Sequence, residues 1–369
     1  MRVLIAGGGT GGHLYPGVAV AEEVIARGGQ VLFVGTSRGI EARVLPAAGY
    51  SLELLQISGL NRVGLAAFLR GVGRLPLAFF RSVAIIRRFQ PDVVLGVGGY
   101  ASGPLVMAAA LTGKPTAIQE QNSVPGFTNR VLGRLVGRVF TAFESAAKAF
   151  PARKIILTGN PVRQSFFRGR PSGVLPAAPI ASPATTTSQG HRLLILGGSQ
   201  GSRAVSDLVL AAAKTLMPTR ALTIVHQAGT ADLERVTAAY AVLGLADRVR
   251  VVPFIDDMVA AYKAADLVIA RAGALTLAEL AIAGRPAVLI PLPTAADDHQ
   301  SKNAADFAAR GAALVLAQGT TTGDALAAEL ARLLDDDVRR GQMAAAMAGL
   351  AHPRAAAAVV DALQELAST

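Results

Sequence analysis

Short apolar runs rich in valine, isoleucine and leucine alternate along this chain with alanine-rich segments of helical length. The first cycle consists of RVLIAG at 2–7, YPGVAVAEEVIARG at 15–28 and QVLFVG at 30–35. Apolar runs of this length are typical of buried strands, and strands that alternate with helices form parallel sheets. The pattern therefore predicts an α/β fold of the doubly wound, Rossmann-like type.

The same pattern starts a second time near the middle of the chain. HRLLILGGSQGS at 191–202 repeats the opening VLIAGGGTGG at 3–12, and Gly7, Gly8 and Gly11 each have a glycine counterpart 190 positions later. The repeat predicts two doubly wound parallel-sheet domains that face a cleft. In such sheets ligands bind beyond the carboxyl ends of the strands, so the loops that follow strands are the candidate sites.

The repeat also sets the expected domain boundaries. The first domain is expected to comprise residues 1–162 together with a C-terminal helix at about 351–369, and the second to comprise residues 163–350. Residues 171–190 are rich in proline, alanine, serine and threonine, a composition that does not form a packed core. We expect a mobile loop there.

Composition narrows the class of protein. Of the 369 residues, 51% are hydrophobic and 17% are charged, which excludes a disordered chain and a coiled coil. The chain has no cysteine, so disulfides, thiolate chemistry and cysteine-based zinc sites are excluded. The first residues lack the features of a signal peptide, and we expect a cytosolic location.

The positive charge is concentrated in the first half of the chain. Residues 1–163 contain 18 Lys and Arg against 7 Asp and Glu, whereas residues 164–369 contain 18 of each kind. A basic half should attract phosphates, whether of nucleic acid, anionic lipid or a pyrophosphate substrate. An arginine-rich proteome is the alternative explanation.

Two glycine-rich loops follow predicted strands in the first half. The loop at 7–13 permits a tight turn and lets backbone N–H groups approach an anion. It formally fits the G-x-G-x-x-G pattern of dinucleotide-binding proteins, but the second strand ends at 35–38 in GTSR, without the acid that binds a ribose. The second loop, at 96–104, predicts a surface for a large phosphate-bearing ligand, and plain structural turns are the alternative.

Further polar motifs follow the later strands. The cluster at 120–130 carries amides suited to sugar hydroxyls, and Arg163 in TGNPVR suits a phosphate clamp at a hinge. In RAGALTLAE at 271–279, small residues at a helix start suit a pyrophosphate, and the final glutamate suits a ribose diol. The acids and histidine at 297–299 are too weak a pattern for a metal site.

Residues 61–88 combine apolar and basic side chains without any acid. This mixture is typical of a segment that lies on a membrane surface, although part of the apolar stripe also fits a core role. The residues expected to form this membrane patch are Phe68, Leu69, Arg70, Phe79, Phe80, Arg81 and Arg88.

In this order and spacing, the motifs resemble those of the bacterial peptidoglycan N-acetylglucosaminyltransferases. These enzymes transfer N-acetylglucosamine from UDP-N-acetylglucosamine to lipid I and form lipid II. The resemblance extends from residue 2 to about 308 and is carried by GGTGGHLYPGVAVAE, GVGGYASGP, EQNSVPGFTNR, GNPVR, GGSQGS, PFIDDM, RAGALTLAE and DDHQSKNA. It implies a GT-B fold and inverting transfer to the C4 hydroxyl of the N-acetylmuramoyl sugar, with no cofactor and no retained metal.

The resemblance also implies roles for individual residues. His13 is expected to be the base that takes the proton of the acceptor hydroxyl. The residues expected to bind the donor are Thr10, Gly11, Gly12, Asn122, Arg163, Ser199, Ile255, Ala274, Leu275, Thr276, Leu277, Ala278, Glu279, Gln300 and Asn303. The residues expected on the acceptor side are Gly98, Gly99, Tyr100 and Ser102.

Two other functions compete with this one on the sequence alone. A UDP-sugar 2-epimerase would share the architecture, although the acids of its first domain are not evident. A nucleic-acid-binding protein would carry aromatic stacking platforms, whereas this chain has no Trp and 5 Tyr, so no nucleic acid partner is expected.

The resemblance also sets the expected partners and location. The expected partners are UDP-N-acetylglucosamine, lipid I, an anionic membrane surface and other cell-wall synthesis proteins. The expected location is the cytoplasmic face of the inner membrane, where the protein would be held peripherally.

Overall fold

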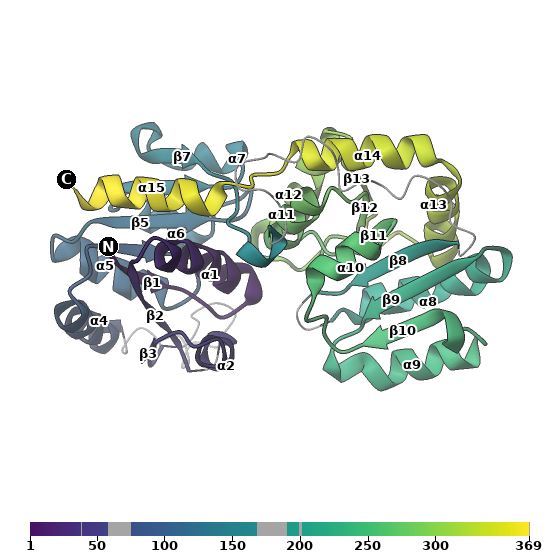
Figure 1. The fold of residues 1–369 in the computed structure, drawn as a ribbon, viewed down its shortest axis with the longest axis horizontal. Helices are drawn as coiled ribbons and strands as arrows, with labels where there is room; N and C mark the ends of the chain where they lie inside the picture. Colours follow the sequence, from purple (N-terminus) through teal and green to yellow (C-terminus); the bar gives the residue numbers. More distant parts are fainter. Residues whose placement is uncertain (38, 58–74, 168–189, 199–200, 369) are drawn as a thin grey trace. The chain divides into compact units, whose positions relative to one another are not determined.

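The computed structural model contains two compact units, each built on one parallel sheet (Figure 1). The described residues are 1–37, 39–57, 75–167, 190–198 and 201–368. The first unit comprises Met1–Gln164 and His352–Thr369, and the second comprises Ser165–Ala351. The predicted doubly wound α/β class is thereby confirmed, while almost all of the expected loop at 171–190 lies outside the described residues.

The sheet of the first unit has seven strands in the order β3-β2-β1-β4-β5-β6-β7. Their bounds are β1 Arg2–Ala6, β2 Gln30–Thr36, β3 Leu52–Leu55, β4 Val93–Gly96, β5 Thr116–Glu120, β6 Arg138–Thr141 and β7 Ile155–Leu157. The central strand β1 pairs in parallel with β2 on one side and with β4 on the other. The strand order reverses between β1 and β4, which is where open α/β sheets bind ligands.

Helices cover both faces of this first sheet. Those on one face are α1 (Gly11–Ala26), α2 (Glu41–Ala47) and α15 (Ala355–Ala367), and those on the other are α4 (Leu75–Phe89), α5 (Ser102–Leu111) and α6 (Phe127–Leu132). A short helix, α7, spans Glu144–Ala147.

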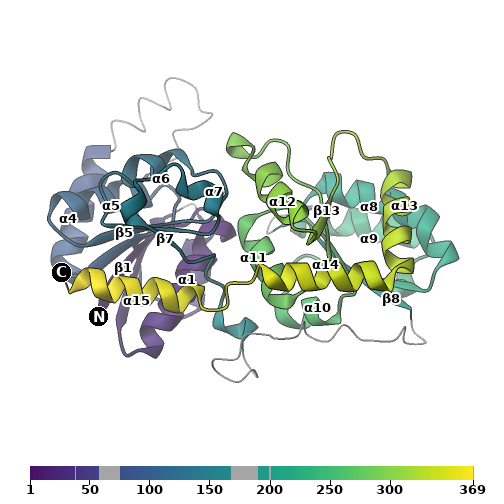
Figure 2. The same cartoon turned by 90° about the horizontal axis from the view of Figure 1, so that it is seen from above.

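The C-terminal helix α15 lies beside α1 on the first unit, as Figures 1 and 2 both show. The Arg27 guanidinium donates to Asp361 at 2.6 Å and to Gln364 at 3.0 Å. Polar contacts at the end of α1 therefore reinforce the apolar packing of α15.

The sheet of the second unit has six strands in the order β10-β9-β8-β11-β12-β13. Their bounds are β8 His191–Leu196, β9 Leu222–Gln227, β10 Val249–Val252, β11 Leu267–Ala270, β12 Ala287–Leu289 and β13 Ala313–Val315. The helices are α8 Arg203–Leu216, α9 Leu233–Val242, α10 Met258–Ala264, α11 Ala274–Ala283, α12 His299–Ala309, α13 Gly323–Asp335 and α14 Asp337–Gly349. Short 3-10 turns occur in the first unit at Ala152–Lys154, at the boundary of the units at Gln164–Phe166, and in the second unit at Met217–Thr219, Thr230–Asp232, Ala246–Arg248 and Ala296–Asp298.

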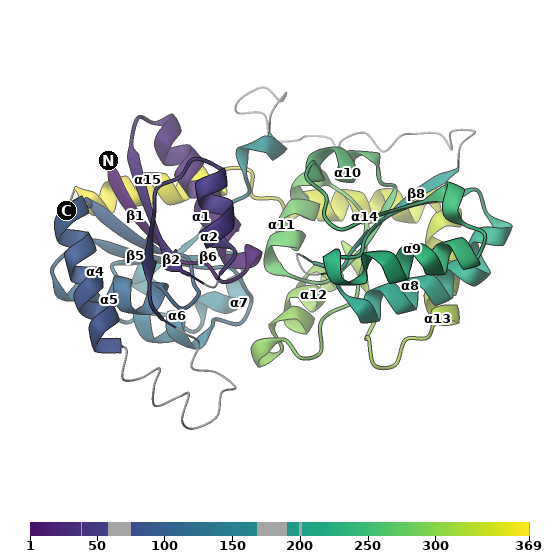
Figure 3. The same ribbon diagram turned by 90° about the horizontal axis from the view of Figure 1, so that it is seen from below.

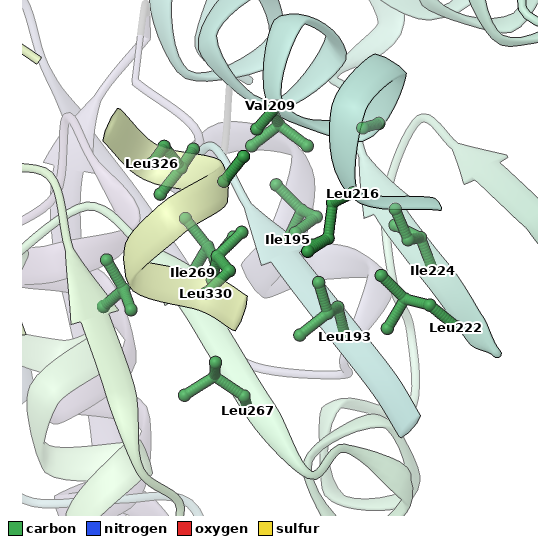
Figure 4. Packing of buried hydrophobic residues seen from close by; sticks show 14 of the residues in the cluster. Leu193, Ile195, Val209, Leu216, Leu222, Ile224, Leu267, Ile269, Leu326 and Leu330 are labelled. Carbon is green, nitrogen blue, oxygen red and sulfur yellow. The ribbon is translucent and has the colours of Figure 1, made fainter. Parts of the chain in front are cut away.

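The core of the second unit forms where β8 and β11 meet α8 and α13. Leu193, Ile195 and Ile269 point from the strands toward Leu216 and Leu330 on the helices (Figure 4). Figure 3 shows α8 and α9 along one face of this sheet. The packing of branched apolar side chains on a parallel sheet explains the uninterrupted apolar runs of the sequence.

A polar cluster lies inside this second core. His226 Nε2 is 3.2 Å from Ser206 Oγ, and His226 Nδ1 is 3.1 Å from Tyr240 Oη. All three side chains are buried, and burial lowers the pKa of His226 to about 4. The fold therefore keeps this imidazole neutral at pH values where it would be charged in the unfolded chain.

We predict that His226 makes the second unit sensitive to acid. The folded-state pKa lies below the ordinary value of 6.5, so the stabilisation is complete above pH 6.5 and is lost as the pH falls toward 4. A shift of this size corresponds to about 3 kcal/mol of unfolding free energy. Urea unfolding at pH 7 and pH 4.5 should show a smaller pH effect in His226→Gln than in the wild type. Equal pH effects in the two proteins would contradict the assignment.

Candidate functional site

The first glycine loop joins β1 to α1 and ends in the first helical turn. Gly8 and Gly9 have φ values of 142° and 87°, which side-chain-bearing residues rarely adopt. The carbonyl of Thr10 accepts the backbone N–H of His13 at 3.2 Å. The glycines therefore turn the chain so that His13 enters the first turn of α1.

The second glycine loop lies directly against the first. Gly98 and Gly99 have φ values of 90° and 83°. A Cβ on Gly99 would lie 2.4 Å from the carbonyl oxygen of Gly8, and a Cβ on Gly98 would lie 2.6 Å from the ring of His13. The lack of side chains at these positions lets the His13 imidazole rest on the backbone of the second loop.

The contacts of His13 suit a general base. Its Nδ1 lies 3.3 Å from Thr10 Oγ1, and the side chain is only half-buried. If Nδ1 carries the proton and donates a hydrogen bond to the Thr10 hydroxyl, the basic lone pair is on Nε2. That tautomer can accept a proton from a hydroxyl bound on the side of the second loop.

The residues expected on the acceptor side fall into two groups. Gly98 and Gly99 form the loop that touches His13, and Tyr100 is exposed beside them. Ser102 is fully buried, and its hydroxyl lies 2.4 Å from where a Cβ on Gly96 would be. Ser102 therefore lies beneath the start of the second loop, with none of its surface exposed.

A buried carboxylate shapes the loop that carries Asn122. Glu120 accepts the N–H groups of Asn122 at 3.0 Å and Gly126 at 3.1 Å, and the Asn129 amide at 2.8 Å. Burial raises the pKa of Glu120, and these hydrogen bonds act in the opposite direction. Asn122 itself is half-buried, and its side-chain amide also donates to Glu120 at 3.4 Å.

Arg163 lies against helix α1. Its guanidinium carbon is 4.5 Å from the centre of the Tyr15 ring, a cation–π distance, and the next backbone N–H, of Gln164, donates to Glu22 at 2.7 Å. The sequence indicated the arginine but not Tyr15. The feature of the sequence that could have indicated Tyr15 is its position, an aromatic residue one turn into the helix that follows a glycine loop.

In the second unit, α11 begins at the segment expected to bind a pyrophosphate. Ala274 and Leu277 are buried, whereas Leu275, Thr276 and Ala278 are half-buried. These five residues form the first turns of a ten-residue helix, whose N-terminus carries the positive end of the helix dipole.

Glu279 is buried and is held by a tyrosine. Its Oε2 accepts the hydroxyl of Tyr262 at 3.3 Å, and the Tyr262 ring packs on Phe166 with ring centres 6.1 Å apart. An ordinary solvated glutamate would be exposed, whereas Glu279 is buried. Its burial and its hydrogen bond to Tyr262 fix the orientation of the carboxylate. Sequence reasoning did not identify Tyr262, which lies on α10, seventeen positions earlier.

A buried arginine joins the loops at the carboxyl edge of the second sheet. Arg271 donates to the carbonyls of Ile290 at 2.9 Å and Pro291 at 3.1 Å, to Ser202 Oγ at 2.7 Å and to Gln318 Oε1 at 2.6 Å. Burial lowers the pKa of Arg271. Its hydrogen bonds connect the segments after β8, β11, β12 and β13, a role the sequence did not reveal.

The remaining donor-side residues differ in accessibility. Gln300 is half-buried and accepts the N–H of Leu292 at 3.0 Å, whereas Asn303 is fully buried and donates to the carbonyl of Ala272 at 3.3 Å. Asn303 therefore supports the start of α11 from within. Ile255 is half-buried in the loop after β10, and Ser199 lies outside the described residues.

The expected membrane patch is described only in its second part, on α4. Phe80 is 69% exposed and Leu77 is 52% exposed, and Arg81 and Arg88 are also exposed. Phe79 instead packs against the core of the first unit. Phe68, Leu69 and Arg70 lie outside the described residues.

Within the described ranges, no helix has both the length and the apolar character to cross a membrane. No group of three or more His, Asp or Glu side chains there is arranged to hold a metal ion.

Comparison with known proteins gives consistent matches along the whole chain. The model of the glycosyltransferase family 28 N-terminal domain matches residues 3–141, and that of the C-terminal domain matches residues 192–359. A protein of Anaeromyxobacter sp. (strain Fw109-5), named UDP-N-acetylglucosamine--N-acetylmuramyl-(pentapeptide) pyrophosphoryl-undecaprenol N-acetylglucosamine transferase, is 47% identical over 371 residues. That match covers 99% of this chain and 93% of the relative.

Two solved structures bear on the same question. MurG of Acinetobacter baumannii has a TM-score of 0.77 and 34% identity, with 99% of each chain covered. The UDP-GlcNAc 2-epimerase of Neisseria meningitidis, bound to UDP-GlcNAc, has a TM-score of 0.67 and 15% identity, covering 99% of this chain and 100% of that chain. The second likeness concerns the fold alone.

Proposed function

The chain belongs to glycosyltransferase family 28, and from this premise we infer that it transfers N-acetylglucosamine from UDP-N-acetylglucosamine to lipid I, forming lipid II. Lipid I is undecaprenyl-pyrophosphoryl N-acetylmuramoyl-pentapeptide, so the chain is a hexosyltransferase of peptidoglycan synthesis. The observation that carries this function is the 47% identity to a transferase of that name over 99% of the chain.

The reaction is an inverting substitution at the anomeric carbon of N-acetylglucosamine. The C4 hydroxyl oxygen of the acceptor forms a bond to that carbon, and its proton passes to a base. The bond from that carbon to the diphosphate oxygen breaks, and UDP leaves with the electron pair. Catalysis then needs a positioned base and a cationic or dipolar environment for the departing diphosphate.

His13 is our candidate for the base. It is half-exposed, it lies against the backbone of the Gly98–Gly99 loop, and its Nδ1 lies 3.3 Å from Thr10 Oγ1, so that a proton on Nδ1 would make Nε2 the basic nitrogen. The acceptor sugar would lie over that second loop, beside the exposed Tyr100.

The second unit is our candidate for the nucleotide site. The start of α11 would stabilise the diphosphate through its N–H groups, and Glu279, aimed by Tyr262, would accept hydrogen bonds from the ribose hydroxyls. The backbone at Ile255 would hold the uracil, and Gln300 would bind the hydroxyls of the donor sugar. Arg163, stacked on Tyr15, would add positive charge at a phosphate.

The membrane surface is the remaining partner in this proposal. A lipid-linked acceptor keeps its pyrophosphate at the bilayer surface, and α4 carries exposed apolar and basic side chains suited to an anionic leaflet. We therefore expect peripheral binding at the cytoplasmic face of the inner membrane, with other cell-wall synthesis proteins as further partners.

The first prediction for this function concerns His13. In an assay with UDP-N-acetylglucosamine and a soluble lipid I analogue, His13→Ala should lower turnover about 10²- to 10⁴-fold, the usual contribution of a positioned base. The affinity for UDP should stay near the wild-type value. His191→Gln is the control and should keep full turnover, because His191 begins β8 in the second unit, at the end of the strand away from the loop that follows it.

Two outcomes of this assay would overturn parts of the proposal. A fall in UDP affinity equal to the fall in turnover would make His13 a donor-binding residue. Conversion of UDP-N-acetylglucosamine to its 2-epimer by the wild type, without transfer to the acceptor, would replace the proposed function altogether.

The second prediction concerns Glu279. Loss of a charge-assisted hydrogen bond costs about 1.5 to 3 kcal/mol, so Glu279→Ala should weaken UDP binding by roughly 10- to 100-fold. Tyr262→Phe should weaken UDP binding by a smaller factor, because it removes only the hydrogen bond that orients the Glu279 carboxylate. Calorimetric titration measures both.

A ribose analogue makes this test specific. This analogue keeps only one of the two ribose hydroxyls, so the difference in affinity between wild type and Glu279→Ala should be smaller for 2′-deoxy-UDP than for UDP. An undiminished difference between the two proteins on this analogue would show that Glu279 does not bind the 2′-hydroxyl.

The third prediction concerns the membrane. Each basic residue near an anionic leaflet contributes about 1 kcal/mol, so Arg81→Glu with Arg87→Glu should weaken binding to anionic liposomes by roughly tenfold or more. Leu77→Ser with Phe80→Ser should also weaken it, whereas Val242→Ser, at a still more exposed apolar position on the second unit, should not. Sedimentation that shows no loss in either double variant would move the membrane contact away from α4.

A further inference from the structure

Glu41 is a fully buried acid that joins two segments of the first unit. It is the first residue of α2, and none of its surface is exposed. Its Oε2 accepts the backbone N–H of Gly9 at 2.7 Å, and its Oε1 accepts the backbone N–H of Thr36 at 2.8 Å and the Thr36 hydroxyl at 2.9 Å. One carboxylate thus connects the end of β2 to the glycine loop that follows β1.

The surrounding backbone encloses this side chain closely. A Cβ on Gly8, Gly35 or Gly39 would lie 2.2, 2.4 or 2.0 Å from atoms of the Glu41 side chain. Three glycines from different segments therefore make the space in which the carboxylate sits. A buried carboxylate is stable only when its oxygens are hydrogen-bonded, as they are here.

The glycine loop needs an anchor of this kind. Glycines at φ values of 142° and 87°, as at Gly8 and Gly9, have many alternative conformations, so their own sterics do not fix the path of the chain. The hydrogen bond from Gly9 to Glu41 selects one of them. The next residue is Thr10, whose carbonyl accepts the N–H of His13 and whose hydroxyl lies 3.3 Å from His13 Nδ1.

We propose that Glu41 is a positioning residue for glycosyl transfer: its buried carboxylate fixes the first glycine loop and, through Thr10, holds the His13 imidazole where it takes the acceptor proton. This inference rests on the proposed function of His13. Glu41 itself is fully buried and is not placed to bind a ligand. That carboxylate binds the protein's own backbone, and the Gly9 N–H it accepts is not available to a ligand phosphate.

The test uses the full-length protein and the nearly isosteric variant Glu41→Gln. An amide has only one acceptor oxygen, so either the Gly9 or the Thr36 contact is lost. With the soluble acceptor analogue, turnover should fall about 10- to 100-fold, the effect of a misplaced catalytic group. The affinity for UDP should be unchanged, and Glu365→Gln, an exposed change of the same charge in the same unit, should have no effect.

Nuclear magnetic resonance gives a readout that does not depend on activity. In Glu41→Gln the amide proton whose contact is lost, that of Gly9 or that of Thr36, should move to higher field, and the imidazole resonances of His13 should change their position or their titration. Wild-type turnover in Glu41→Gln, or unchanged imidazole resonances of His13, would overturn the proposal.

Two further arms separate the alternatives. If Glu41→Gln does not fold, Glu41→Asp keeps the charge, shortens the reach to Gly9 and is judged by the same readouts. If the wild type fails to transfer sugar while the resonances still respond to Glu41, then the proposed function fails and the structural link from Glu41 to His13 stands.

Discussion

Contact between two loop backbones shapes the carboxyl edge of the first sheet. The carbonyl oxygen of Gly8 lies so close to Gly99 that a Cβ there would be 2.4 Å away. This approach is possible because β1 and β4 are neighbours, with Ala6 opposite Gly96, so that both strands release their loops at the same level. The same closeness brings the His13 ring against the second loop. A side chain at Gly98 would displace this imidazole.

Buried ionisable side chains hydrogen-bond to the loops of both units. In the first unit, Glu41 and Glu120 accept N–H groups of loops that have no regular hydrogen-bond partners. In the second unit, Arg271 donates to loop carbonyls. Irregular backbone cannot satisfy its own polar groups when it is buried, so a charged side chain takes the place of secondary structure. Loops that follow strands are thereby kept in one shape before any ligand binds.

The sequence predicted the fold class and the location of the loops well, because both follow from local pattern. Apolar runs gave the strands, and glycines after them marked the turns. The sequence did not reveal the partners that hold the functional side chains, because Glu41 meets Gly9, and Tyr262 meets Glu279, only through tertiary contacts. For the same reason it did not distinguish accessible residues from supporting ones. Ser102 and Asn303 occupy motif positions, yet both are fully buried.

Helix α4 connects the proposed membrane contact to the proposed acceptor site through the chain itself. Ile85 and Ile86 anchor the helix in the core of the first unit, while Phe80 and its basic neighbours face outward. Strand β4 then runs from Val93 to Gly96. The loop that follows it is the one against which the His13 ring rests. Because helix and strand share one core, a bilayer bound to α4 would be held in a fixed relation to that loop. A lipid-linked acceptor, confined to the bilayer surface, would then approach the base with most of its translational freedom already removed.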